Sequence, residues 1–236
     1  MPNPYFQFKQ FTVRHDKCAM KVGTDGVLLG AWAPVQDVKR ILDVGAGSGL
    51  ISLQLAQRNP EAVITSVEID PAAAAQAQEN IQSSPWSNRM EVVCCDFRKY
   101  HPEDKFDLIV SNPPYFVDSL QSPDPGRNAG RHTVSLSYGE LIEGVLALLA
   151  ERGLFAVILP VHEGAVFEQM ALERGLHVVR KLQVQTKPDV PAKRVLMEFA
   201  RCQAPLRFAT LVMETGRPQE YSEAYRGLTR DFYLKF

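Results

Sequence analysis

The sequence has no long hydrophobic run. None of its stretches approaches the roughly 20 consecutive apolar residues that a membrane-spanning helix needs. It also begins Met-Pro-Asn-Pro-Tyr, without the basic segment and apolar core of a secretory signal. From these two absences we predict a protein that lies in no membrane and stays in the cytoplasm.

Cysteine is scarce as well. The chain has four cysteines, and none shows the C-x-x-C or other spacing that is typical of metal ligands. Its five histidines (residues 15, 101, 132, 162 and 177) are scattered in the same way. Because a structural metal site needs several such ligands close together, we expect no metal, and in the cytoplasm we expect reduced thiols.

The net charge is small. With 26 basic and 27 acidic residues the chain has a formal charge of −1, which excludes a general affinity for polyanions. A nucleic-acid surface would have to be a local patch. The 236 residues, of which 45% are hydrophobic, are sufficient for one large domain with a complete core.

Apolar runs and helical segments alternate along the chain. The pattern predicts strands at 41–44, 62–67, 90–95 and 106–110, helices at 50–58 and 71–80, then a helix at 139–150, a strand at 153–159, a helix at 163–174 and two final strands. Such alternation is typical of a parallel sheet covered by helices. The carboxyl ends of parallel strands share one edge, so polar groups that follow these strands are expected to line one cleft.

A glycine-rich turn follows the first of these strands. Gly45, Gly47 and Gly49 come shortly after Asp43 and lead into a helix. Glycine lets a ligand approach the main chain closely, and a helix N-terminus favours a negative group. The spacing Gly-x-Gly-x-Gly differs from the Gly-x-Gly-x-x-Gly of dinucleotide-binding loops. Alone, the turn is a weak indication of a ligand site.

Acidic residues follow the second and third strands. Glu68 and Ile69 come about 20 residues after Gly49, the spacing at which an acid meets the ribose of an adenosine ligand. The carboxylate of Asp96 can accept a hydrogen bond from an adenine amine, and the ring of Phe97 can lie against the base. For Glu68 the alternative is a solvated strand end without a ligand.

The fourth strand ends in Asn112-Pro113-Pro114-Tyr115, which is stiff and extended because proline lacks an N–H and has a fixed φ. The Asn112 side chain and the Pro113 carbonyl can accept both hydrogens of one planar amine, and Tyr115 offers a ring for stacking. Two acceptors would orient such an amine and raise its nucleophilicity. The alternative is a plain turn with asparagine as its cap.

Taken in order, these strand ends resemble those of the S-adenosylmethionine-dependent methyltransferases of the Rossmann-like class, in particular the branch that methylates amines. The resemblance implies an α/β fold with a seven-stranded, mostly parallel sheet and helices on both faces. The roles it implies are the methionine part of the cofactor for Asp43 and the glycine turn, ribose for Glu68, adenine for Asp96, and the target amine for residues 112–115.

Three further segments, 11–32, 129–138 and 228–236, resemble the bacterial valine-tRNA adenine-N6-methyltransferases. In that family the target is the adenosine just 3′ of the anticodon. The resemblance therefore implies tRNA as substrate and S-adenosylmethionine as cofactor, and we expect no obligate protein partner. It places Lys21 and Thr24 in a segment that closes over the cofactor. Residues 1–33, a hairpin and one helix, then precede a methyltransferase domain at 34–236.

The stretch 116–135 is a first candidate for contact with RNA. Loops of this length inside a domain often bind a ligand, and this one contains Arg131 and His132. We expect it to order when RNA binds. The alternative is an insertion without a role, in which His132 is merely exposed.

The stretch 172–207 is a second candidate. Its eight basic and three acidic residues give it a charge of +5 (8 − 3). If the final strand is antiparallel, as the resemblance implies, the loop before it lies on the cofactor side. Lys187, Lys193 and Arg194 in this loop are then our leading candidates for phosphate contacts. A solvated face without a partner is the alternative.

Other functions share parts of the pattern. Protein-glutamine methyltransferases that act on release factors have the same corner, but they typically begin with a helical domain. Ribosomal-RNA and DNA amino-methyltransferases would use the same cleft. A cofactor-binding RNA chaperone would not need two acceptors aimed at an amine. We predict a tRNA adenine-N6-methyltransferase and keep these alternatives open.

Overall fold

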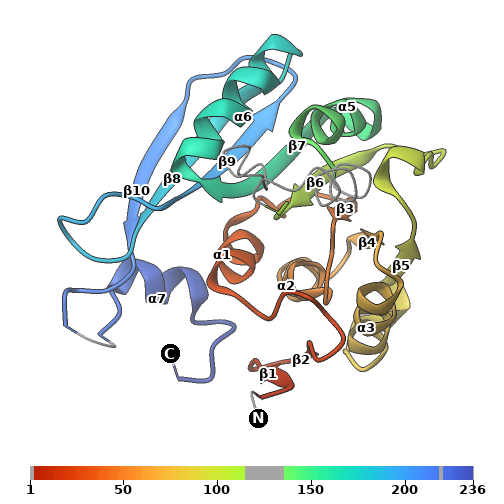
Figure 1. Ribbon diagram of the computed structural model, residues 1–236, viewed down its shortest axis with the longest axis horizontal. Helices are drawn as coiled ribbons and strands as arrows, with labels where there is room; N and C mark the ends of the chain where they lie inside the picture. Colours follow the sequence, from red (N-terminus) through yellow and green to blue (C-terminus); the bar gives the residue numbers. More distant parts are fainter. Residues whose placement is uncertain (1–2, 115–135, 218–219, 236) are drawn as a thin grey trace, which may run out of the picture.

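The computed structural model describes residues 3–114, 136–217 and 220–235 (Figure 1). Its helices are α1 (Thr24–Trp32), α2 (Leu50–Arg58), α3 (Pro71–Gln82), α5 (Tyr138–Leu148), α6 (Val161–Glu173) and α7 (Glu223–Thr229), with short 3-10 helices η1 (Ser87–Arg89) and η2 (Phe97–Lys99). Its strands are β1 (Tyr5–Gln7), β2 (Thr12–Arg14), β3 (Arg40–Val44), β4 (Val63–Glu68), β5 (Met90–Cys94), β6 (Phe106–Ser111), β7 (Leu149–Pro160), β8 (His177–Gln185), β9 (Arg194–Ala200) and β10 (Arg207–Val212).

The main sheet has the strand order β10-β8-β9-β7-β6-β3-β4-β5. Only β9 runs antiparallel to its neighbours among these described strands. This confirms the predicted α/β class and the mostly parallel sheet, but the prediction of seven strands was wrong. The eighth strand, β10, pairs with the edge strand β8, and its first four residues are exposed. No buried apolar run marks it in the sequence, because almost nothing covers it.

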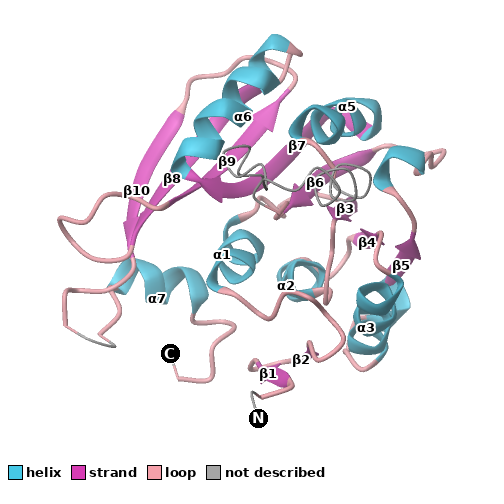
Figure 2. Ribbon diagram, in the orientation of Figure 1, coloured by secondary structure: helices cyan, strands magenta, loops and turns pink. Residues whose placement is uncertain are grey.

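Helices cover both faces of this sheet (Figure 2). Helices α1, α2 and α3 pack on one face, and α5 and α6 pack on the other. Along β7 the side chains alternate between these two cores: Ala156 and Ile158 join the first, Phe155 and Val157 the second. A strand buried on both faces reads as a continuous apolar run, which is why the central strands could be predicted from the sequence.

The N-terminal hairpin β1–β2 packs on the same core as α1 and α2. Phe8, Phe11 and Val13 are buried in one cluster with Ile41 of β3. The C-terminal segment closes this region, since the Lys9 amide donates to the carbonyl of Phe232 over 2.8 Å. The hairpin and helix predicted for the first 33 residues are present. The division of the chain at that point stays a prediction.

The described residues contain neither a candidate membrane-spanning helix nor a candidate metal site. No helix in these ranges is long and apolar enough to cross a membrane. Nor do three His, Cys, Asp or Glu side chains group there in a way that could hold a metal ion.

Candidate functional site

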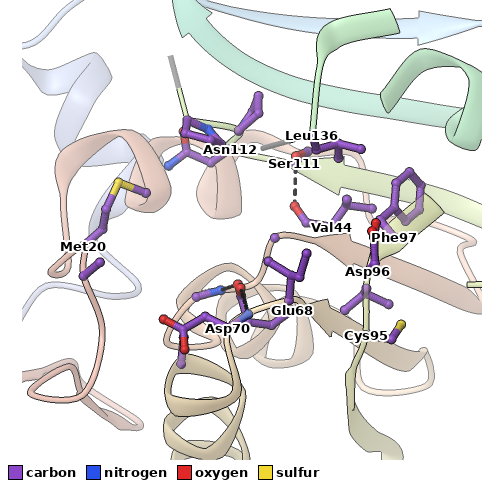
Figure 3. Close-up of a pocket in the computed structure, with 18 of the residues that line it drawn as sticks. Met20, Val44, Glu68, Asp70, Cys95, Asp96, Phe97, Ser111, Asn112 and Leu136 are labelled. Carbon is purple, nitrogen blue, oxygen red and sulfur yellow. Dashed lines mark hydrogen bonds between the residues drawn. The ribbon is translucent and has the colours of Figure 1, made fainter. Parts of the chain in front are cut away.

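A cavity of about 290 Å³ opens at the carboxyl ends of β3, β4, β5 and β6. Figure 3 shows Glu68 and Asp70 on one wall, Asn112 on another, and Asp96 with Phe97 beyond them. The polar groups predicted to share one cleft therefore do so. The segments that line the cavity are Cys18–Met20, Val44–Gly47 without Ala46, Val67–Asp70, Ala73, Cys95–Arg98, Ser111–Pro114 and Leu136.

The glycine turn forms the floor of this cavity. Gly45 and Gly47 have φ angles of 73° and 56°, in the left-handed region that disfavours side chains. The amide of Gly45 donates to the carbonyl of Val67 over 2.9 Å, which holds the turn against β4. A Cβ at either glycine would meet no atom within 4 Å. The space above the main chain is therefore open to a ligand.

Asp43 lies beneath the turn and is fully buried. Its Oδ2 accepts from the amide of Ser52 over 3.1 Å and from the Ser52 hydroxyl over 2.7 Å. Its Oδ1 is buried and has no hydrogen-bond partner among the described residues. Burial raises the pKa of this carboxyl to about 6, although the Ser52 hydrogen bonds favour the charged form. Asp43 lines neither cavity of the site, so its charge can act on a ligand only across the glycine turn.

Glu68 joins the glycine turn to the next helix. One carboxylate oxygen accepts from the amide of Gly47 over 2.8 Å and the other from the amide of Asp70 over 2.9 Å. Asp70 in turn caps α3, where its side chain accepts from the amide of Ala72. Ile69 is half exposed beside it. Glu68 is therefore held rigidly at the edge of the cavity.

Asp96 forms an ion pair with Arg98, which the sequence analysis did not predict. Its carboxylate accepts from Nε of Arg98 at 2.9 and 3.0 Å and from Nη2 at 2.6 Å. These bonds lower the pKa of Asp96, so the group stays charged. The ring of Phe97 is 6% exposed and packs in the core under α5.

The corner after β6 lies across the cavity from Glu68. The Ser111 hydroxyl donates to the carbonyl of Val44 over 2.9 Å and fixes the end of β6 to β3. Pro113 is buried, while Asn112 is half-buried and its side chain has no hydrogen-bond partner in the described part of the chain. Tyr115 lies outside the described residues, so its stacking role stays a prediction.

A second cavity of about 420 Å³ adjoins the first and shares Gly45, Gly47 and Asn112 with it. Lys21 and Thr24 line this second cavity and not the first. The two predicted residues are thus brought to the corner, on the far side of the glycine turn from Asp96.

The basic residues of 172–207 are mostly paired. Because β9 is antiparallel to both β7 and β8, the loop before it lies at the same edge of the sheet as the cavity, as expected. There Arg194 pairs with Asp25 of α1 at 2.8 Å, and Lys187 lies 3.9 Å from Glu214. Lys193 is exposed and forms no ion pair with a described residue. The other RNA candidates, Arg131 and His132, lie outside the described residues.

Arg98, Met20 and Cys18 are among the cavity residues that were not singled out from the sequence. Burial and nearby carboxylates, with Glu68 first, raise the pKa of Cys18 to about 11, so it stays a thiol. For Arg98 a signal existed, since a base two residues after a strand-end acid can fold back onto it. Met20 and Cys18 carry no comparable pattern.

The chain resembles two curated relatives over its whole length. A protein of Bacteroides fragilis, named tRNA1(Val) (adenine(37)-N6)-methyltransferase, is 53% identical over 100% of both chains. A protein of Salmonella typhi with the same name is 46% identical over 97% of this chain and 94% of its own. The chain belongs to this family. The family model of the methyltransferase small domain also matches residues 21–135. Membership confirms the prediction of a methyltransferase enzyme.

Solved structures agree on the fold of the family. A predicted O-methyltransferase from Agrobacterium tumefaciens matches with a TM-score of 0.70 at 21% identity, over 88% of this chain and 96% of that one. A putative RNA methyltransferase from Pyrococcus horikoshii matches with a TM-score of 0.52 at 16% identity, over 75% and 82%. At such identities these likenesses show the fold alone.

Proposed function

We propose that this enzyme transfers a methyl group from S-adenosylmethionine to N6 of adenosine 37 in tRNA1(Val), the reaction that its relatives' names state. The observation that carries the proposal is the meeting of Asn112, Glu68 and Asp96 around one cavity. Each of the three was assigned a part of this reaction from its place in the sequence. Their convergence supports a single site for cofactor and amine.

The residues around the cavity fit S-adenosylmethionine. The space above Gly45 and Gly47 is open. Behind this turn lies Asp43, which lines neither cavity and whose Oδ1 has no partner among the described residues. Taken together, the two adjoining cavities of about 290 and 420 Å³ fall in the usual range for small-molecule sites. A cationic ligand would compensate the charge of Asp43, which burial otherwise makes costly.

The division of the cavity follows from its donors and acceptors. Glu68 offers carboxylate oxygens to ribose hydroxyls, with the apolar Ile69 beside it. Asp96 offers an acceptor to the adenine amine, and Phe97 an apolar wall for the base. The methionine part would then lie over the glycine turn, toward the second cavity that Lys21 and Thr24 line.

The chemistry needs little more than positioning. S-adenosylmethionine supplies a methyl group on a positively charged sulfur; a C–N bond forms as the C–S bond breaks. The Asn112 side chain and the Pro113 carbonyl accept the two hydrogens of the target amine and so aim its lone pair. The amine's surplus proton leaves to solvent afterwards. The adenine must leave the base stack to enter, which costs least in a single-stranded loop.

The loop before β9 is the proposed contact for the RNA backbone. Arg194 is held beside the second cavity by Asp25, while Lys187 and Lys193 are exposed. Cations near the entrance can bind phosphates on either side of a flipped base. This assignment explains how a chain with a net charge of −1 could bind a polyanion locally.

A methyl-transfer assay tests the proposal. The purified protein is incubated with labelled S-adenosylmethionine and unmodified tRNA1(Val), followed by nucleoside digestion and mass spectrometry. The matched control is the same tRNA with guanosine in place of adenosine 37. We expect N6-methyladenosine in the first RNA and no label in the second.

Two results would contradict the proposal. Label in both RNAs would place the target elsewhere in the tRNA. Label confined to ribosomal RNA or to a release factor would keep the methyltransferase and replace its substrate.

A further inference from the structure

Asp96 and Arg98, shortly after β5, are held in place by each other and by helix α5. Arg98 folds back onto Asp96, and its own backbone amide also donates to Asp96 over 3.0 Å. The remaining amine of the guanidinium, Nη1, donates to Glu140 of α5 over 3.0 Å. The Asp96 carboxylate is thus fixed in orientation by a group that is itself fixed from another element.

Helix α5 supports this arrangement at two points. Glu140 is tied to Ser137 in a capping box, where its Oε2 accepts from the amide and hydroxyl of Ser137 over 2.8 and 2.7 Å. One turn later, a Cβ at Gly144 would lie 2.3 Å from the ring of Phe97. The bare main chain at Gly144 therefore lets this ring pack directly against α5.

An arginine fork is the geometry that fixes a carboxylate best. Nε, Nη2 and the backbone amide of Arg98 all donate to the Asp96 carboxylate, which has about four lone-pair sites and so keeps capacity for one further donor. The Asp96 side chain is 16% exposed, and both residues line the cavity. A ligand donor can thus meet a carboxylate that has no freedom to turn away.

We propose that Arg98 is a positioning residue: it holds Asp96 turned toward the adenine amine of S-adenosylmethionine, and Glu140 braces Arg98 from α5. The inference rests on the proposed function, because it takes the ligand's adenine to lie against Asp96. It assigns to Arg98 the selection of an amino purine over a keto purine. A keto oxygen in place of the amine would face the fixed carboxylate without a hydrogen to share.

Binding measured by calorimetry tests this role. The probes are S-adenosylhomocysteine and S-inosylhomocysteine, which differ at the purine 6-position. We expect the wild-type protein to prefer the adenosine compound, and Arg98→Ala to reduce that preference about tenfold because Asp96 is no longer oriented. Arg98→Lys should recover only part of it, since an ammonium is a point charge without the fork.

Two more variants test whether Glu140 holds Arg98 in place. Glu140→Gln keeps a capping side chain but removes the charge that holds Arg98, and should reduce the preference by roughly threefold. Lys99→Ala is the matched control, because Lys99 is exposed on the same short helix and forms no ion pair with a described residue. It should change the preference less than about twofold.

The outcomes separate this inference from the proposed function. If Arg98→Ala weakens both compounds equally, or leaves both unchanged, the wild-type preference does not depend on Arg98 and the inference is wrong, while the methyltransferase assignment stands. If the wild-type protein binds neither S-adenosylmethionine nor S-adenosylhomocysteine, the cofactor site itself is wrong, and both fall together.

Discussion

The two halves of the sheet use polar side chains in opposite ways. At the ends of β3 and β6, Oδ1 of Asp43 and the Asn112 side chain have no partner within the described residues. In β8–β10, by contrast, the buried Glu198 pairs with Arg180 at 2.7 Å and with Arg207 at 3.5 Å. Arg180 also lies 3.8 Å from the ring centre of Trp32 and donates to its carbonyl.

This contrast distinguishes groups kept for a ligand from groups that hold the fold together. A buried polar atom without a partner costs stability and persists where a ligand later satisfies it. Glu198, Arg180 and Arg207 line neither cavity of the site, so this buried ion group adds no binding capacity there. The contrast also corrects the meaning of the +5 charge of residues 172–207, because most of those bases are already engaged. We therefore expect substitutions of the polar groups at the ends of β3 and β6 to reduce activity. Substitutions of the ion group in β8–β10 should reduce stability.

The largest effect is expected at the corner. Asn112→Ala should raise the barrier to methyl transfer by about 3 kcal/mol, the usual loss for one preorganised hydrogen-bonding group. Affinity for S-adenosylmethionine and the unfolding free energy should stay nearly unchanged, because the amide forms no hydrogen bond with a described residue. Single-turnover rates, calorimetry and urea denaturation measure the three quantities. A parallel loss of cofactor affinity would show that Asn112 also binds the cofactor.

The second effect is expected in the other half. Glu198→Gln leaves the partly buried Arg180 without its counter-charge, and should lower the free energy of unfolding by about 2 kcal/mol. The melting temperature should fall by roughly 5 °C for a domain of this size. Calorimetric binding of S-adenosylmethionine just below the transition should be unaltered. If affinity fell while stability did not, the proposed contrast between the halves would be wrong.

Asp43 should make stability depend on pH. Because burial raises its pKa from 3.8 to about 6, the folded protein holds a proton between these values that the unfolded chain has released. Its contribution is therefore favourable at low pH and is lost as the pH rises to about 6, by roughly 3 kcal/mol. Urea denaturation of the wild type and Asp43→Asn across this window measures the difference, which a saturating cofactor should diminish. Equal pH profiles would contradict the assignment.

The smallest effect concerns the RNA. Lys193→Ala should weaken tRNA binding by about 1 kcal/mol or less and reduce the slope of log affinity against log salt by about 0.9. Lys181→Ala is the matched control from the same basic stretch, because Lys181 already pairs with Glu168 at 2.6 Å. Filter binding at several salt concentrations measures both slopes. Equal slopes for the two variants would remove Lys193 from the interface.

Most of the first half was determined by the sequence itself. The helix predicted at 50–58 is α2, Leu50–Arg58. Glu68 is the last residue of β4, Asp96 lies two residues after β5, and Asn112 directly follows β6. Local chemistry decides these features: apolar runs mark buried strands, and glycine and proline end them. Because parallel strands end at one edge, Glu68, Asp96 and Asn112 could be assigned to one cleft before any contact was known.

Only the tertiary structure decided which polar groups meet across elements. Arg98 and Glu140 are 42 residues apart in the chain, and the local sequence around neither residue predicts their contact. The pairing of Glu198 with Arg180 and Arg207 depends on β8 lying between β9 and β10, and β10 itself was not predicted. Strand order and register are set by packing of the whole core, so ion pairs that follow from them cannot be read from local sequence.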